Sequence, residues 1–108
     1  MTPRLPTPGA LLAFEAAARH ESFARAAQEL SLTEGAISRQ VAKLEDFLGV
    51  RLLNRVSNRA ELSVPGIRYA GEMRELLERL ERQTRQFIAH AQGSRLLDLG
   101  AIPTMVRR

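Results

Sequence analysis

The sequence predicts a mainly α-helical fold that carries one small two-stranded hairpin and one long helix near its C-terminus. Three observations predict it. Helix-capping residues precede three apolar-patterned segments within the first 50 residues, a short alternating stretch follows them, and a heptad pattern runs over residues 70–91. With 108 residues, of which 44% are hydrophobic, the chain has room for one small domain and one appendage.

Each of the first three helices has a recognisable start. Thr7 precedes a proline and is expected to cap a helix over residues 8–20. Ser22 is expected to cap a short helix over residues 23–30, and Thr33 a third over residues 34–48. Gly49 then ends the third helix, because glycine readily adopts the left-handed conformation common after a helix end.

The third helix has one apolar side and one polar side. Its apolar side chains recur at a spacing of three and four residues, which predicts a stripe that faces the core. These residues are Ile37, Val41, Leu44 and Leu48.

A change of pattern after Gly49 predicts the hairpin over residues 51–63. Ser57 and Asn58 are suited to its turn, and apolar residues alternate with polar ones up to Val64. Ser63 can cap a fourth helix, which we expect to run over residues 64–92.

The fourth helix carries apolar residues at alternating intervals of three and four, which is the pattern of a coiled-coil seam. A domain of about 60 residues is too small to bury so long a seam, so the pattern predicts a homodimer through this helix. The predicted dimerisation residues are Ala70, Met73, Leu77, Leu80, Thr84, Phe87 and Ala91.

The pattern of residues 93–108 predicts a further strand after the long helix. Gly93 and Ser94 are expected to break the long helix, and residues 95–102 read as a strand that has no partner strand in this chain. We therefore expect residues 93–108 to be the start of a further domain that is truncated here.

The composition narrows the class of function. The chain has 16 basic residues against 12 acidic ones, a net charge of +4, and 15 of the basic residues are arginines, which suit phosphates and base edges. It has no cysteine and no apolar run of membrane-spanning length, so we expect a cytoplasmic protein without membrane attachment. We find no catalytic constellation, phosphate loop or metal-ligand spacing, and therefore expect neither an enzyme nor a cofactor or metal site in this chain.

Two short helices joined by a tight break and followed by a basic hairpin describe a winged helix-turn-helix. Its third helix would present Gly35, Arg39 and Lys43, with Ser38 at the side, to the major groove of double-stranded DNA. Arg39 can form two hydrogen bonds to a guanine, whereas Lys43 fits a phosphate contact and a plain exposed lysine equally well.

Residues 21–55, ESFARAAQELSLTEGAISRQVAKLEDFLGVRLLNR, resemble the amino-terminal region of LysR-type transcriptional regulators. The resemblance rests on SFARAAQEL, on L-T-x-G-A-I-S-R-Q-V, on LE followed by LGVRLLNR, and on Leu62 with Ser63 before a long helix, and it covers about residues 5–102. The opening LPTPGALLAFEAAARHESF looks most like the glycine-cleavage and β-lactamase activators of that family.

The resemblance implies a DNA-binding domain over residues 1–63, with its helix-turn-helix at 23–42 and its wing at 51–63, and a linker helix at 64–92. It also implies an effector domain outside this chain that binds a small-molecule co-inducer. At full length such a regulator is expected to form tetramers, and RNA polymerase is a further expected partner. The positions that map to base reading are Glu34, Gly35, Ser38 and Arg39, and those that map to phosphate and minor-groove contacts are Ser22, Thr33, Arg55, Asn58 and Arg59.

The sequence departs from the family pattern at the proposed base-reading surface. Glu34 stands where the family often has glutamine; a carboxylate only accepts hydrogen bonds, which favours a cytosine amino group and is repelled by phosphate. Asn58 and Arg59 stand where the wing often has arginine and glycine. A second hypothesis is a coiled-coil adapter that binds proteins and has no specific DNA binding.

Overall fold

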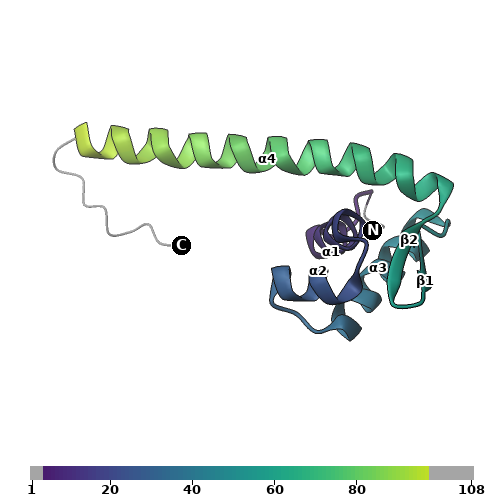
Figure 1. Ribbon diagram of the computed structural model, residues 1–108. Coiled ribbons are helices and arrows are strands. Elements are labelled where there is room, and N and C mark those ends of the chain that lie inside the picture. The colour runs from purple at the N-terminus through teal and green to yellow at the C-terminus, as the bar shows by residue number, and fades with distance from the viewer. Residues whose placement is uncertain (1–3, 98–108) are drawn as a thin grey trace. The chain divides into compact units, whose positions relative to one another are not determined.

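The computed structural model describes residues 4–97 and confirms a mainly helical fold with one two-stranded sheet (Figure 1). The first three helices have the predicted bounds. The elements in order are α1 (Pro8–His20), α2 (Phe23–Leu30), α3 (Glu34–Leu48), β1 (Leu53–Val56), β2 (Arg59–Leu62) and α4 (Val64–Leu97).

Side-chain caps start the first three helices, as the sequence predicts. The hydroxyls of Thr7, Ser22 and Thr33 each accept a hydrogen bond from the backbone N–H three residues later, at 3.3, 3.0 and 3.0 Å. Each cap satisfies one of the N–H groups that the first turn of a helix leaves without a backbone partner. Gly49 ends α3 in the left-handed conformation, with φ 74°, which also confirms the prediction.

The core of the N-terminal part, residues up to Arg74, forms where α1, α2, α3 and the hairpin meet. The stripe predicted on α3 faces it: Ile37, Val41 and Leu44 are buried, and Leu48 packs at its edge. Alanines dominate the buried side of α1, so neighbouring helices can approach its backbone closely. The largest fully buried side chains are Phe14, Ile37, Leu44 and Leu52.

The hairpin has the predicted turn. Its antiparallel strands pair Leu53 with Leu62 and Val56 with Arg59, which leaves Ser57 and Asn58 as a two-residue loop. Both loop residues have positive φ, 50° and 68°, the backbone of a turn whose twist matches that of the strands.

Glu45 on α3 fixes the start of this hairpin. Its Oε2 accepts hydrogen bonds from the backbone N–H groups of Leu52, at 2.8 Å, and Leu53, at 3.0 Å. Leu52 and Leu53 are buried, so their N–H groups have little access to water. Glu45 therefore satisfies two donors that would otherwise be costly to bury.

We expect Glu45→Ala to lower the free energy of unfolding by about 1–3 kcal/mol, because it leaves both donors without an acceptor. Urea denaturation measures the change. The neighbouring Asp46 is exposed and serves as the matched control: Asp46→Ala removes the same charge and should change stability by less than about 0.5 kcal/mol. Equal effects of the two substitutions would show that the charge matters and the two hydrogen bonds do not.

The start of α4 is held against the hairpin and α1. The Ser63 hydroxyl caps the helix by accepting from the N–H of Gly66, at 3.0 Å, and donates to the carbonyl of Arg51, at 2.6 Å. Further along, the Tyr69 ring lies 5.8 Å from the Phe14 ring, centroid to centroid. The first turns of α4 thus belong to the N-terminal domain.

The predicted end of α4 is wrong. The helix continues through Gly93 and Ser94 to Leu97, so residues 95–97 are helical and not the start of a strand. A single glycine costs a helix interior about 1 kcal/mol, which alone does not end a long helix. The rest of the predicted strand, residues 98–102, lies outside the described residues. Within residues 4–97, no helix has both the length and the apolar character that crossing a membrane requires.

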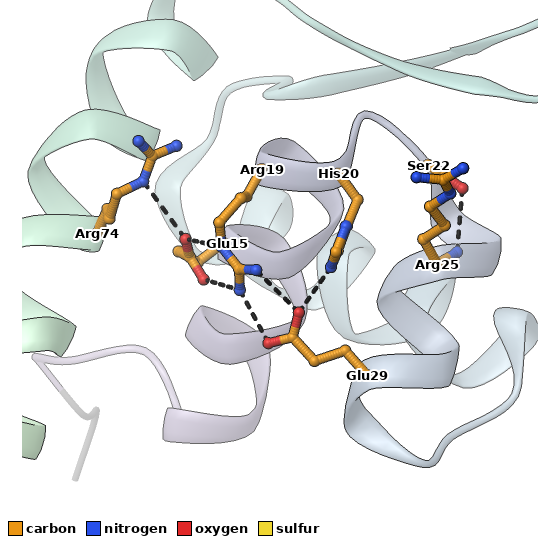
Figure 2. A network of polar contacts seen from close by, with 7 residues as sticks. All are labelled: Glu15, Arg19, His20, Ser22, Arg25, Glu29 and Arg74. Carbon is orange, nitrogen blue, oxygen red and sulfur yellow. Dashed lines mark hydrogen bonds and ion pairs between the residues drawn. The ribbon is translucent and has the colours of Figure 1, made fainter.

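A polar network joins α1, α2 and the early part of α4 (Figure 2). Arg19 donates to Glu15 and to Glu29 through four hydrogen bonds of 2.9 Å. Glu15 is only 8% exposed, and Arg74 of α4 approaches it to 3.6 Å. The His20 ring contacts Glu29 at 2.6 Å, which gives this histidine a structural role.

The network makes the free energy of unfolding depend on pH in the acidic range. The hydrogen bonds from Arg19, and next the contact with His20, lower the pKa of Glu29 from 4.5 to about 2. Because the folded-state pKa is depressed, the contribution of Glu29 to stability is complete above about pH 4.5 and is lost as the pH falls toward 2. The Glu29 side chain is 38% exposed, so solvent screening keeps this contribution modest.

We expect Glu29→Gln to destabilise the chain at about pH 6 and to have a smaller effect at about pH 3. Urea denaturation of both proteins at the two pH values gives the comparison. Glu72 is exposed and has no ion pair within the described residues, so Glu72→Gln should show no such convergence. A Glu29→Gln effect that stays constant with pH would contradict the role of the network.

Candidate nucleic-acid interface

The residues predicted to face DNA lie on the side of α3 that faces away from the core. Gly35, Arg39, Ala42 and Lys43 are exposed, and Ser38 is half-buried beside them. Successive residues turn by about 100° around a helix, so these positions share one face while the buried stripe occupies the other. The structure thus brings the predicted base-reading side chains onto one accessible helix surface.

The small size of Gly35 makes room for Arg39 at the start of α3. A Cβ atom on Gly35 would lie 3.3 Å from Nη1 of Arg39, so the guanidinium folds back over the glycine. Among the described residues, neither Arg39 nor Lys43 has an ion-pair partner within 4 Å. Both cations are therefore available to an anionic ligand. Arg39 lies in the N-terminal half of α3 and folds back toward its first turn, where the helix dipole also favours negative charge.

Arg55 reaches from β1 onto the same surface. Its Nη2 donates to the Ser38 hydroxyl at 3.1 Å, and its Nη1 lies 3.6 Å from Oε1 of Glu34. The guanidinium carbon sits 4.2 Å from the centroid of the Phe23 ring, a cation–π contact. Glu34, Ser38 and Arg55 therefore form one cluster, although Ser38 and Arg55 are 17 positions apart in the sequence.

The other predicted wing residues, Asn58 and Arg59, do not belong to this cluster. Arg59 pairs with Glu21 at 2.9 Å, and both side chains are 62% exposed. The N–H of Ala60 also donates to the carbonyl of Glu21, which ties β2 to the corner between α1 and α2. Asn58 is exposed at the tip of the turn.

Sequence reasoning missed how these charges pair. It placed Arg55 and Arg59 at a nucleic-acid surface but predicted no partner for either within the fold. The available signals were the opposite charges of Glu34 and Glu21 and the aromatic ring of Phe23. A pairing between them depends on the tertiary fold, so spacing along the chain could not have identified it.

The predicted dimerisation seam needs one correction. Ala70 is only 5% exposed and packs in the core of its own domain, because the first turns of α4 lie against that core. Leu80 and Phe87, in contrast, are 63% and 72% exposed. Leu76 and Ile88, which the narrow heptad seam omitted, are exposed on the same side of the helix at helical spacing.

Comparison with known proteins identifies what this chain resembles. A sequence model of the family described as "Bacterial regulatory helix-turn-helix protein, lysR family" matches residues 9–66. The glycine cleavage system transcriptional activator of Escherichia coli strain K12 is 43% identical over 91 residues, which cover 84% of this chain and 30% of the relative. TrpI, an HTH-type transcriptional regulator of Pseudomonas aeruginosa, is 46% identical over 80 residues, which cover 74% of this chain and 27% of the relative. The chain thus spans less than a third of the length of these curated relatives.

Solved structures agree on the fold. The CbnR_DBD–DNA complex has a TM-score of 0.67 and 34% sequence identity over 76% of this chain and 94% of that chain. The complex of BenM_DBD with catB site 1 DNA has a TM-score of 0.69 and 28% identity over 75% of this chain and 90% of that chain. Both neighbours were solved with DNA bound.

Proposed function

The chain belongs to the lysR family of bacterial regulatory helix-turn-helix proteins, and on this premise we propose that it is the DNA-binding part of a sequence-specific transcriptional regulator. The observation that carries the proposal is the exposed face of α3, where Arg39 and Lys43 stand without ion-pair partners among the described residues. The DNA complexes of the similar CbnR and BenM domains support it. Because the matched relatives are transcriptional regulators, we propose no enzymatic activity and a cytoplasmic site of action on DNA.

The proposed mechanism divides affinity from specificity. α3 enters the major groove, where each base pair presents a distinct set of donors and acceptors. Contacts to phosphates come from Lys43, from the caps Ser22 and Thr33, and from Asn58 and Arg59 of the wing; they position the domain without reading sequence. Arg39 reads a guanine, and Glu34, Gly35 and Ser38 lie beside it on the same helix end.

We propose that two copies bind a dyad operator through α4. The apolar side chains of the predicted seam beyond Ala70 occupy one face of the helix, and most of that surface is exposed in the single chain; they are Met73, Leu77, Leu80, Phe87 and Ala91. Pairing two such faces removes their apolar surface from water. It also sets the two recognition helices about 34–36 Å apart, or a multiple of that distance. The polar Thr84, whose hydroxyl donates to the Leu80 carbonyl at 2.8 Å, sits within this face.

Replacing Leu77 and Leu80 together by aspartate should convert the dimer to monomer, because two charges would enter the apolar interface. Sedimentation velocity measures the change. The matched control is Gln86→Asp with Ala89→Asp, which adds the same two charges on the opposite, exposed face of α4 and should leave the dimer intact. If the leucine variant sediments as a dimer, the proposed face is not the interface.

For the longer protein we propose a small-molecule co-inducer that binds an effector domain outside this chain, tetramers at full length, and contact with RNA polymerase. The support is the length and the names of the relatives, which are regulators more than three times as long as the matched segment. We assign no residue of this chain to the co-inducer or to RNA polymerase.

Selection of sheared genomic DNA on the purified chain, followed by a salt titration of the enriched sites, tests the proposed function. We expect a dyad sequence whose log binding constant falls linearly with log salt, because bound arginines and lysines release counterions. DNA that stays unenriched at every salt concentration would favour the alternative function, a coiled-coil protein adapter. The face of α3 argues against that alternative, because an adapter needs no unpaired cations there.

A further inference from the structure

Arg55 is held in place on three sides. The ring of Phe23 beneath its guanidinium is only 5% exposed and belongs to the core, so the platform for the cation is rigid. The hydrogen bond to Ser38 and the ion pair with Glu34 hold the guanidinium on its other two sides. An arginine fixed in this way presents its charge to one defined spot on α3.

That spot is the carboxylate of Glu34. Glu34 is the first residue of α3 and its side chain is 53% exposed, so it reaches the surface that the proposed function places against DNA. An isolated carboxylate at this surface would be repelled by the phosphates. Arg55 lies 3.6 Å from Oε1 of Glu34 and offsets that charge, and no residue in the described part of the chain forms an ion pair with Oε2.

We propose that Arg55 is a positioning residue for base recognition, which holds Glu34 so that its carboxylate reads the amino group of a cytosine in each half-site. The inference rests on the proposed function and adds the residue that makes an acidic side chain compatible with it. A carboxylate accepts from cytosine N4, whereas no other base edge in the major groove offers a donor without an adjacent acceptor on the same base. Arg55 thus acts on base choice through Glu34, without reading the base itself.

Arg59 provides a matched control. It lies on the same hairpin and carries the same charge, but it pairs with Glu21 of the α1–α2 corner. Arg59→Gln therefore removes the same charge from the wing and leaves the cluster of Glu34, Ser38 and Arg55 intact.

The experiment selects binding sites from a pool of DNA in which the half-site is randomised, with the unmodified chain and with Arg55→Gln, Glu34→Gln and Arg59→Gln. For the unmodified chain we expect a cytosine preference of at least about fivefold at one position of each half-site. Arg55→Gln and Glu34→Gln should each reduce it to less than about twofold, and the double substitution should add nothing further. Arg59→Gln should weaken binding to all sequences and keep the preference.

Arg55→Lys supplies a second variant if Arg55→Gln proves unstable in thermal unfolding. A lysine keeps the charge but cannot contact Ser38 and Glu34 with one planar fork, so we expect the cytosine preference of Arg55→Lys to lie between those of Arg55→Gln and the unmodified chain.

Three results would overturn the inference. If Arg55→Gln lowers affinity for every sequence equally, reduces the salt slope by about 1 and keeps the cytosine preference, Arg55 is a phosphate contact and does not position Glu34. If the unmodified chain selects a sequence but Glu34→Gln changes no position of it, the inference fails while the proposed function stands. If the unmodified chain selects no sequence at all, the proposed function fails and the inference fails with it.

Discussion

Arg39→Ala is expected to remove most of the discrimination between the operator and scrambled DNA while leaving the proposed dimer unchanged. The side chain lies on the exposed face of α3 and folds over Gly35, at the end of the helix that we place in the major groove. Loss of a bidentate arginine–guanine contact removes about 1–3 kcal/mol of discrimination for each half-site. Over the two half-sites of a dimer, the specificity ratio falls by the square of the single-site factor.

Competition binding at several salt concentrations measures this loss, and sedimentation checks the dimer. Lys43→Ala is the comparison, because Lys43 is an exposed cation on the same face. If it contacts a phosphate, binding should weaken about equally for all sequences, with a salt slope lower by about 1. Retained discrimination by Arg39→Ala would remove Arg39 from the reading surface.

Gly66→Ala is expected to have the largest effect on stability. A Cβ atom at this position would lie 2.2 Å from the carbonyl oxygen of Leu52, far inside van der Waals contact. That carbonyl cannot move away easily, because it accepts from the N–H of Ser63 at 2.9 Å and belongs to the buried Leu52. We expect a loss of about 3 kcal/mol or more, since α4 must shift away from the hairpin to relieve the overlap.

Gly71 is the matched control, because it lies on the same helix and a Cβ atom there would meet nothing within 4 Å. Gly71→Ala should stabilise the chain by up to about 1 kcal/mol, through better helix propensity. Thermal and urea unfolding compare the two variants. A Gly66→Ala protein as stable as the unmodified chain would mean that α4 starts in a different position from the one described.

Up to the start of α4, the sequence alone was sufficient to predict the local structure, whereas the predicted end of α4 was wrong. Thr7, Ser22 and Thr33 marked the helix starts because capping depends on a hydroxyl and an N–H three residues apart, and the α3 stripe followed from helical periodicity. The hairpin turn and the exposed face of α3 were predictable for the same reason. These features depend on residues a few positions apart, whose relative placement the backbone geometry already determines.

Only the tertiary structure decided which distant groups meet. Ala70 fits a heptad seam by spacing, but the contact of α4 with the domain buries it in the core. Arg55 is 21 positions from Glu34, and their pairing requires the hairpin to fold back onto α3 beside Phe23. Spacing along the chain determines the face of an element on which a residue lies, whereas the packing of elements determines what that face touches, and packing depends on the whole core.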